Sequence, residues 1–177
     1  MCGIFGVYNA AKAAELAAIG LHNENHRARD FTGIATADGT HLYRHRGKGL
    51  ALEVFKEEEV LNQPHGRDAV GHRRYPTSEQ RPDRTQIQPL DGYFNSERFM
   101  LAHNGNLPNV GELEPRTGPL ASSMDTEAIV ALLSKSRAKT LQQAFAEDIA
   151  PFVKGSYTLG ILLRDRLCAV QAPYHNR

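Results

Sequence analysis

The sequence predicts an α+β fold in which helices are layered on sheets. Its 177 residues suit one domain with a core that buries about 70% of the unfolded chain's surface. Short apolar runs typical of strands are mixed with stretches of helical spacing. Because hairpins and helices alternate irregularly, without repeated strand–helix–strand units, an α+β fold is favoured over a doubly wound parallel sheet.

In the first half of the chain, apolar runs predict four strands and two helices. A strand begins almost at the first residue, and another ends at the Asp38-Gly39 turn, with its hairpin partner after it. Alternating apolar and acidic residues predict the second helix. The strands are expected at residues 4–8, 31–37, 40–44 and 69–75, and the helices at 11–22 and 50–61.

The second half begins with a polar loop at residues 76–89, which is a candidate lid. A buried strand at 99–103 is expected to stop at Asn104-Gly105, and Asp125 to cap a helix. Thr140 and Gln143 have the spacing of a capping box for the next helix. Two apolar strands, 157–163 and 167–170, follow around a charged turn.

Composition places the chain among ordinary soluble globular domains. Hydrophobic residues make up 41% and charged residues 23% of it, and its formal net charge is +1. That balance gives no broad electrostatic footprint for nucleic acid or an anionic membrane. The sequence has no apolar run of the roughly 18 residues that span a bilayer, and no signal-like N-terminus. We therefore expect a cytoplasmic protein that binds neither nucleic acid nor membrane.

The two cysteines, Cys2 and Cys168, have different surroundings in the sequence. Cys168 lies in an apolar run and is expected to be a small buried hydrophobic residue, with no structural disulfide. Cys2 becomes the N-terminal residue once Met1 is removed, which brings a free α-amino group beside its thiol. An α-amino group has a pKa of about 7.7 to 8.0, as a general base at neutral pH requires. One residue can then supply nucleophile and base.

Three polar groups of residues follow predicted strands or begin a helix, where active sites are often built. Arg74 closes a strand and can hold a carboxylate through two hydrogen bonds. Asn104 and Gly105 can direct an amide and a backbone N–H at a developing oxyanion. Asp125, at a helix start, can bind an α-ammonium group. Taken singly, the three are also typical of a surface ion pair, an Asn-Gly turn and a helix cap. Together with Cys2, they match the needs of an α-amino acid that carries a side-chain amide.

A metal enzyme is the rival to check, because the chain has eight histidines. His22 and His26 have i, i+4 spacing, but no HExxH-type glutamate or third ligand accompanies them. No metal and no other cofactor is expected.

The same residues, with others along the chain, resemble the glutaminase domain of class II glutamine amidotransferases. The amidophosphoribosyltransferase branch is the most similar. The resemblance covers nearly the whole chain, residues 1–177, and no acceptor or phosphoribosyltransferase domain is expected within it. The matching segments are 1–6, 26–27, 33–34, 74–77, 88–89, 102–106 and 125–127.

The resemblance implies the N-terminal nucleophile (Ntn) hydrolase fold, with two stacked antiparallel sheets between helical layers. It also implies roles for matching residues. Cys2 would be the nucleophile, and Asn104 and Gly105 the oxyanion hole. Arg74 would bind the α-carboxylate of glutamine, and Asp125 its α-amino group. Arg27 and Thr77 would support the site, and residues 74–85 would form the loop that closes over glutamine.

The expected partners are L-glutamine and an ammonia-accepting synthase subunit or domain. The sequence does not decide whether the chain forms a homo-oligomer. One enzymatic alternative is an Ntn hydrolase for another amide, although Arg74 with Asp125 favours an amino-acid substrate. A second alternative is a non-catalytic glutamine-binding or scaffolding subunit. Its motivation is that Ala28-Arg29 follows His26-Arg27 where the family usually has a glycine.

Overall fold

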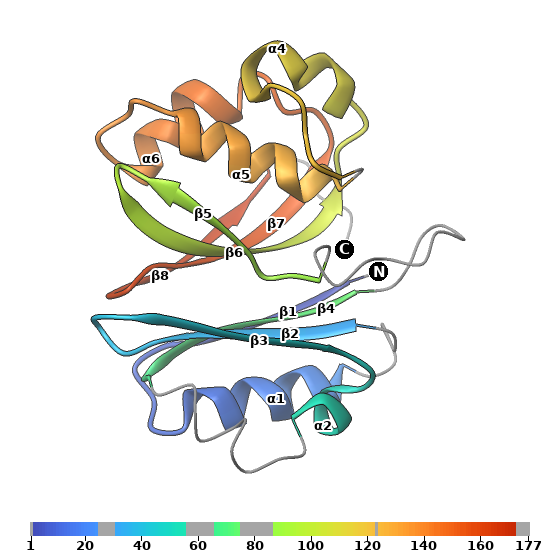
Figure 1. The fold of residues 1–177 in the computed structure, drawn as a ribbon, viewed down its shortest axis with the longest axis vertical. Coiled ribbons are helices and arrows are strands. Elements are labelled where there is room, and N and C mark those ends of the chain that lie inside the picture. Colours follow the sequence, from blue (N-terminus) through green and yellow to red (C-terminus); the bar gives the residue numbers. More distant parts are fainter. Residues whose placement is uncertain (1, 25–30, 56–65, 75–86, 123, 173–177) are drawn as a thin grey trace.

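Two four-stranded antiparallel sheets lie face to face between two layers of helix (Figure 1). This computed structural model describes residues 2–24, 31–55, 66–74, 87–122 and 124–172. The strand order is β1-β4-β2-β3 in the first sheet and β5-β6-β7-β8 in the second. The predicted α+β class is confirmed, and so is the four-layer arrangement that the resemblance implies.

The first half of the chain builds the first sheet and the helical layer on its outer face (Figure 1). Its elements are β1 (Gly3–Val7), α1 (Ala13–Asn23), β2 (Phe31–Ala37), β3 (Leu42–Lys48), α2 (Ala51–Val54) and β4 (Asp68–Arg74). The prediction for β2 is confirmed at both ends, whereas β3 runs four residues past the predicted end. The helix predicted at 50–61 is described only as α2, because residues 56–65 lie outside the described residues.

The second half builds the other sheet and its helical layer. The strands are β5 (Leu90–Phe94), β6 (Glu97–Asn106), β7 (Ser156–Leu162) and β8 (Leu167–Gln171). The helical segments are η2 (Val110–Leu113), α4 (Glu114–Thr117), α5 (Asp125–Lys135), α6 (Leu141–Ala144) and the π-helical turn η3 (Phe145–Ile149). Strand β5 was not predicted, and neither were η2 and α4.

Two predicted boundaries are wrong. Strand β6 continues to Asn106, so Asn104 and Gly105 are paired strand residues and do not form a turn. The residue that caps α5 is Met124, and Asp125 is the first residue of the helix. The side chain of Thr140 does cap α6, because its Oγ1 accepts the N–H of Gln143 at 3.2 Å.

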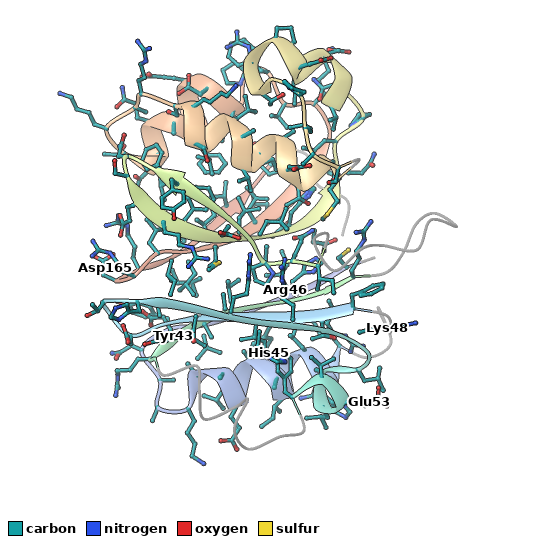
Figure 2. All side chains as sticks on the ribbon, in the orientation of Figure 1. Tyr43, His45, Arg46, Lys48, Glu53 and Asp165 are labelled. Atoms are coloured by element: carbon teal, nitrogen blue, oxygen red, sulfur yellow. The ribbon has the colours of Figure 1, made fainter. Side chains whose placement is uncertain are left out.

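Three apolar clusters explain why the layers stack. One lies between α1, α2 and the first sheet, and another between the second sheet and the helices around α5. The third joins the two sheets through Val70, Met100 and Leu162, which are fully buried. Side chains of β3 alternate between these layers, since Arg46 extends toward the second sheet and His45 toward the helices (Figure 2). In the described part of the chain, no helix is long and apolar enough to cross a membrane.

Candidate active site

The start of the chain lies at the same end of the first sheet as the end of β4. Gly3, the first residue of β1, pairs with Arg73. Cys2 precedes Gly3 and Arg74 follows Arg73, so the antiparallel register carries both residues to one sheet end. Cys2 and Arg74 are each partly buried. The structure thus brings together two of the residues that the sequence singles out.

A buried histidine joins this end of β4 to the second sheet. Nε2 of His72 lies 3.0 Å from the carbonyl oxygen of His103 in β6. Because a carbonyl can only accept a hydrogen bond, Nε2 must carry the proton. Complete burial, followed by the nearby His103, lowers the pKa of His72 to about 3, so its ring is neutral at physiological pH. The contact places Asn104, the residue after His103, against the strand that ends in Arg74.

Beyond Leu101, one side of β6 has no strand partner among the described residues, because β5 pairs only with Glu97–Leu101. Two backbone N–H groups on that side have side-chain acceptors. His103 N donates to Oε1 of Gln88 at 2.5 Å, and Leu107 N donates to Oδ2 of Asp125 at 3.1 Å.

Gly105 lies midway between these two donors. Strand residues two apart present their N–H groups to the same side, so the N–H of Gly105 points toward the side of Gln88 and Asp125. Its partner across the ladder, Tyr157, uses its carbonyl oxygen to accept from Ala172 instead. The described residues supply no side-chain acceptor for the Gly105 N–H.

No side chain fits at Gly105. A Cβ there would overlap the carbonyl oxygen of Ser156 and would lie 2.7 Å from Nε2 of His103. Glycine therefore lets β7 and the His103 ring approach this part of β6 closely. The oxyanion site at Asn104-Gly105 stays a prediction, and its two residues lie in a strand instead of a turn.

Asp125 is held beside this row of N–H groups. Its Oδ1 accepts the N–H of Thr126 at 2.8 Å, while Oδ2 accepts that of Leu107. Burial acts to raise the pKa of Asp125, but interactions with His103 and these two N–H groups outweigh it and hold the pKa below its usual value. Nδ1 of His103 is 3.6 Å from Oδ1, beyond hydrogen-bond range, and its charge contributes only when the ring is protonated. The two N–H groups act at every pH.

Comparison with known proteins finds relatives that are amidophosphoribosyltransferases. An amidophosphoribosyltransferase of Staphylococcus aureus is 36% identical over an alignment of 176 residues that covers 97% of this chain and 35% of that protein. A glutamine phosphoribosylpyrophosphate amidotransferase from B. subtilis, solved with ADP and GMP, is 31% identical with a TM-score of 0.83, over 97% of this chain and 37% of that one. A structure described as the allosteric regulatory enzyme of purine biosynthesis is 31% identical with a TM-score of 0.87, over 98% and 37%. No family model matches the chain.

The chain belongs to the class II glutamine amidotransferases. The relatives confirm the resemblance to the amidophosphoribosyltransferase branch, and their structures confirm the Ntn hydrolase fold. The chain spans 35% of the length of the first of these relatives.

Sequence reasoning missed two buried residues beside these candidate groups. The sequence predicts a polar loop at Gln88 and assigns no role to Thr126, yet Nε2 of Gln88 donates to Oγ1 of Thr126 at 2.9 Å. Two features of the sequence could have singled out Gln88. It directly precedes Pro89, and the pair Gln88-Pro89 is one of the segments that resemble the family. Its contacts could not be read from the sequence, because they join segments far apart in the chain.

Other predicted features cannot be placed. Arg27, Thr77 and the Ala28-Arg29 departure lie outside the described residues, as does the closing loop apart from Arg74. Among the residues that the structure does describe, no three His, Cys, Asp or Glu side chains cluster to hold a metal ion. Cys168 is only half-buried, whereas the sequence predicts a buried residue. Burial raises the pKa of its thiol.

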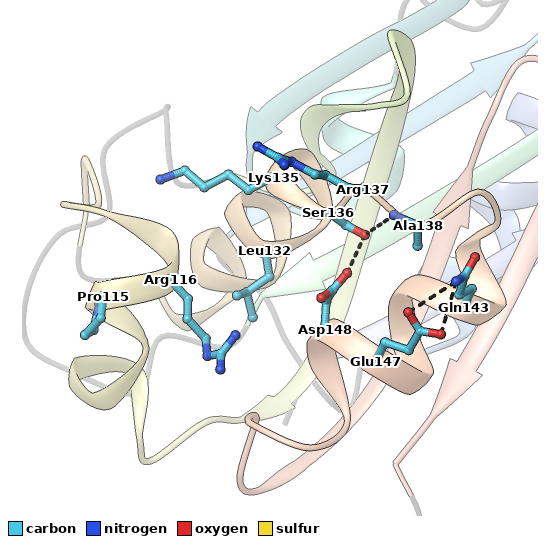
Figure 3. A pocket seen from close by; sticks show the side chains of 10 residues that line it. All are labelled: Pro115, Arg116, Leu132, Lys135, Ser136, Arg137, Ala138, Gln143, Glu147 and Asp148. Atoms are coloured by element: carbon cyan, nitrogen blue, oxygen red, sulfur yellow. Dashed lines mark hydrogen bonds between the residues drawn. The ribbon is translucent and has the colours of Figure 1, made fainter.

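A separate polar pocket lies between α4, α5 and η3 (Figure 3). It includes none of the predicted site residues. Oγ of Ser136 donates to Asp148 there at 2.6 Å, which provides a polar pair outside the site for comparison in mutagenesis.

Proposed function

We propose that this chain hydrolyses the side-chain amide of L-glutamine through a thioester on Cys2 and releases ammonia for an acceptor site in another domain or chain. The proposal is supported by four groups toward one end of the stacked sheets: a thiol, a cation, a carboxylate and a backbone N–H that has no side-chain acceptor among the described residues. They belong to Cys2, Arg74, Gly105 and Asp125. Membership of the class II amidotransferases supports the same assignment.

The first step needs Met1 to be removed, because the base is the α-amino group of Cys2. This amine takes the thiol proton, and the sulfur attacks the amide carbon of glutamine to form a C–S bond. The tetrahedral intermediate then expels the amide nitrogen, which takes a proton from the α-ammonium group and leaves as ammonia. Water attacks the resulting thioester with the amine again as base, releasing glutamate and restoring the thiol.

The oxyanion of both tetrahedral intermediates is assigned to Asn104 and Gly105. The Gly105 N–H points to the open side of β6 and lacks a side-chain acceptor among the described residues. The Asn104 amide is partly buried next to it. Removing one such donor in a hydrolase typically slows the reaction by about 100- to 1,000-fold.

The two ends of glutamine are assigned to opposite charges. Arg74 binds the α-carboxylate, since a guanidinium can offer two parallel donors to it. Asp125 binds the α-ammonium group, and its lowered pKa keeps it ionised at neutral pH. Arg27 and Thr77, which the structure does not describe, support the site, and residues 74–85 close over the bound amino acid.

The acceptor of the ammonia is proposed from the relatives. Their names describe amidophosphoribosyltransferases and an enzyme of purine biosynthesis, so a phosphoribosyl acceptor in a synthase domain or subunit is the assignment. The matched part of those proteins is about a third of their length, which leaves room in them for such an acceptor domain.

The test is covalent labelling by 6-diazo-5-oxo-norleucine, a glutamine-like diazoketone, followed by intact mass measurement. The expected result is one adduct on protein that lacks Met1. The adduct should be absent from Cys2→Ala and present in Cys168→Ser, which changes the other cysteine of the chain. Folded protein without Met1 that stays unlabelled even with its acceptor partner bound would overturn the proposal and support a non-catalytic glutamine-binding subunit.

A further inference from the structure

Three polar residues outside the assigned catalytic groups form a closed ring beneath the site. Gln88, His103 and Thr126 are 4%, 2% and 0% exposed. Gln88 accepts from the backbone of His103 at 2.5 Å and donates to Thr126 at 2.9 Å, and Nδ1 of His103 lies 3.0 Å from Oγ1 of Thr126. We call these three residues the buried triangle.

The orientation of Gln88 within the triangle is fixed by its partners. The backbone N–H of His103 can only donate, so the side-chain atom of Gln88 beside it must be the oxygen. The amide nitrogen therefore faces Thr126 and donates to its hydroxyl. Because all three residues are buried, loss of any one contact leaves a polar group without a partner, which costs about 1–3 kcal/mol.

Each corner of the triangle adjoins a different part of the site. Thr126 follows Asp125 at the start of α5, and His103 precedes Asn104 in β6. Gln88 belongs to the segment before β5, which β3 holds through its arginines. Arg46 donates to the carbonyl oxygen of Ile87 at 2.5 Å, and Arg44 to that of Pro89 at 3.2 Å.

We infer that the buried triangle is a positioning device that sets the Asp125 carboxylate relative to the oxyanion residues Asn104 and Gly105. Without it, Asp125, which accepts from Leu107 directly after β6, provides the only hydrogen bond between α5 and the β6 segment among the described residues. The triangle adds a second connection between α5 and β6. This connection fixes the position at which the Asp125 carboxylate binds the ammonium group. The three residues act through Asp125 and do not touch the reacting atoms. This inference rests on the proposed function.

The decisive variant is Thr126→Val, which removes the hydroxyl and keeps the shape of the side chain. Its matched control is Thr126→Ser, which keeps the hydroxyl. For both, we would measure the alkylation rate of Cys2 with the diazoketone, with its analogue lacking the α-amino group, and with iodoacetamide. The first two reagents differ only in the group assigned to Asp125, and iodoacetamide reports the thiol alone.

The expected result is a selective loss. Thr126→Val should reduce the preference of the wild-type protein for the amino-bearing diazoketone over its analogue by about ten-fold, which corresponds to about 1.4 kcal/mol. The iodoacetamide rate should stay within about two-fold, and Thr126→Ser should restore the preference. A merely structural role would instead lower all three rates together. Unchanged preference in folded Thr126→Val would overturn the inference.

If Thr126→Val does not fold, His103 supplies a second pair of variants. The amide of His103→Asn lies near the position of Nδ1 and can still meet Thr126, whereas that of His103→Gln lies near Nε2. The inference expects the preference to survive in His103→Asn and to fall in His103→Gln, and the reverse order would refute it. Wild-type protein without Met1 that no diazoketone labels, even with the acceptor partner bound, would refute the proposed function instead, so the two failures are distinguishable.

Discussion

His72 and His103 lie on different sheets and are joined by a hydrogen bond from the ring of one to the backbone of the other. Nε2 of His72 is 3.0 Å from the carbonyl oxygen of His103. The donor ring is fully buried, so the bond ties β4 to β6 without access to water. Strand β4 ends in Arg74, and β6 carries Asn104 and Gly105 directly after His103, so the bond links the stability of the sheet stack to the geometry of the site.

Stability should fall in mild acid because of His72. Its pKa is about 3 in the folded protein and about 6.5 when unfolded. Between these values the unfolded state binds more protons, so the free energy of unfolding rises with pH and falls as pH drops below about 6.5. From about pH 7 to about pH 5, His72 alone should remove about 2 kcal/mol. Urea unfolding at the two pH values measures the loss.

His72→Gln is the matched variant for this prediction. Its amide can donate to the His103 carbonyl but does not titrate. It should lose about 2 kcal/mol less than the wild-type protein over the same interval. Equal losses in the two proteins would show that another group sets the acid sensitivity.

Gly33 in β2 should resist substitution because the segment that holds Gln88 crosses over it. A Cβ at Gly33 would overlap the backbone oxygen of Gln88 and would lie 3.0 Å from Cγ of Arg46. Overpacking of this kind costs about 1–3 kcal/mol. Gly33→Ala should therefore lower the free energy of unfolding by that amount and slow diazoketone labelling, because Gln88 shifts.

Gly111 provides the control for the glycine prediction. It lies in η2, and a Cβ there would meet nothing within 4 Å. Gly111→Ala should leave stability unchanged or raise it slightly, since alanine favours helical conformations more than glycine. Equal destabilisation of the two variants would contradict the crowding argument.

Asp125→Asn should weaken recognition of the amino group while sparing the nucleophile. The amide keeps an oxygen acceptor but loses the charge, and a hydrogen bond to a charged group is worth about 1.5–3 kcal/mol. We expect KM for glutamine, or the half-saturating diazoketone concentration, to rise about 10- to 100-fold. The iodoacetamide rate should change little. Asp148→Asn, which removes a charge from the Ser136 pair outside the site, should leave all three values unchanged.

Local signals in the sequence were enough for some elements and insufficient for others. Strand β2 matches its prediction because a continuous run ends at a strong turn signal, where Asp38 accepts from Thr40 and His41. Strand β5 was missed because its hairpin turn uses Asn95 and Ser96 at positive φ, 50° and 65°. The dipeptide Asn-Ser is a weaker hairpin signal in a sequence than Asn-Gly.

The Asn-Gly signal gives a wrong prediction at Asn104-Gly105. This dipeptide usually marks a turn, but pairing with β7 keeps both residues in the strand. The candidate residues themselves were predictable from chemistry, since each has a distinct functional group. The buried triangle was not, because its hydrogen bonds join residues 15, 23 and 38 positions apart. Such contacts depend on how the layers pack, which a local pattern does not specify.

Thr140 should contribute to stability through the cap of α6. Its Oγ1 accepts the N–H of Gln143 at 3.2 Å, and the helical segment that follows carries Ala144 and Ile149 into the core around α5. Replacing such a cap by alanine costs about 1 kcal/mol. Urea unfolding of Thr140→Ala should show this loss in the free energy of unfolding, with an unchanged slope against urea concentration. The free energy of unfolding of Thr140→Ser should stay within about 0.5 kcal/mol of the wild-type value. Among the described residues, Thr140 has no hydrogen bond to a predicted site residue. Because the loss also leaves the fold intact, diazoketone labelling of Cys2 should proceed at the wild-type rate. Slower labelling in folded Thr140→Ala would mean that the helical layer and the site are coupled.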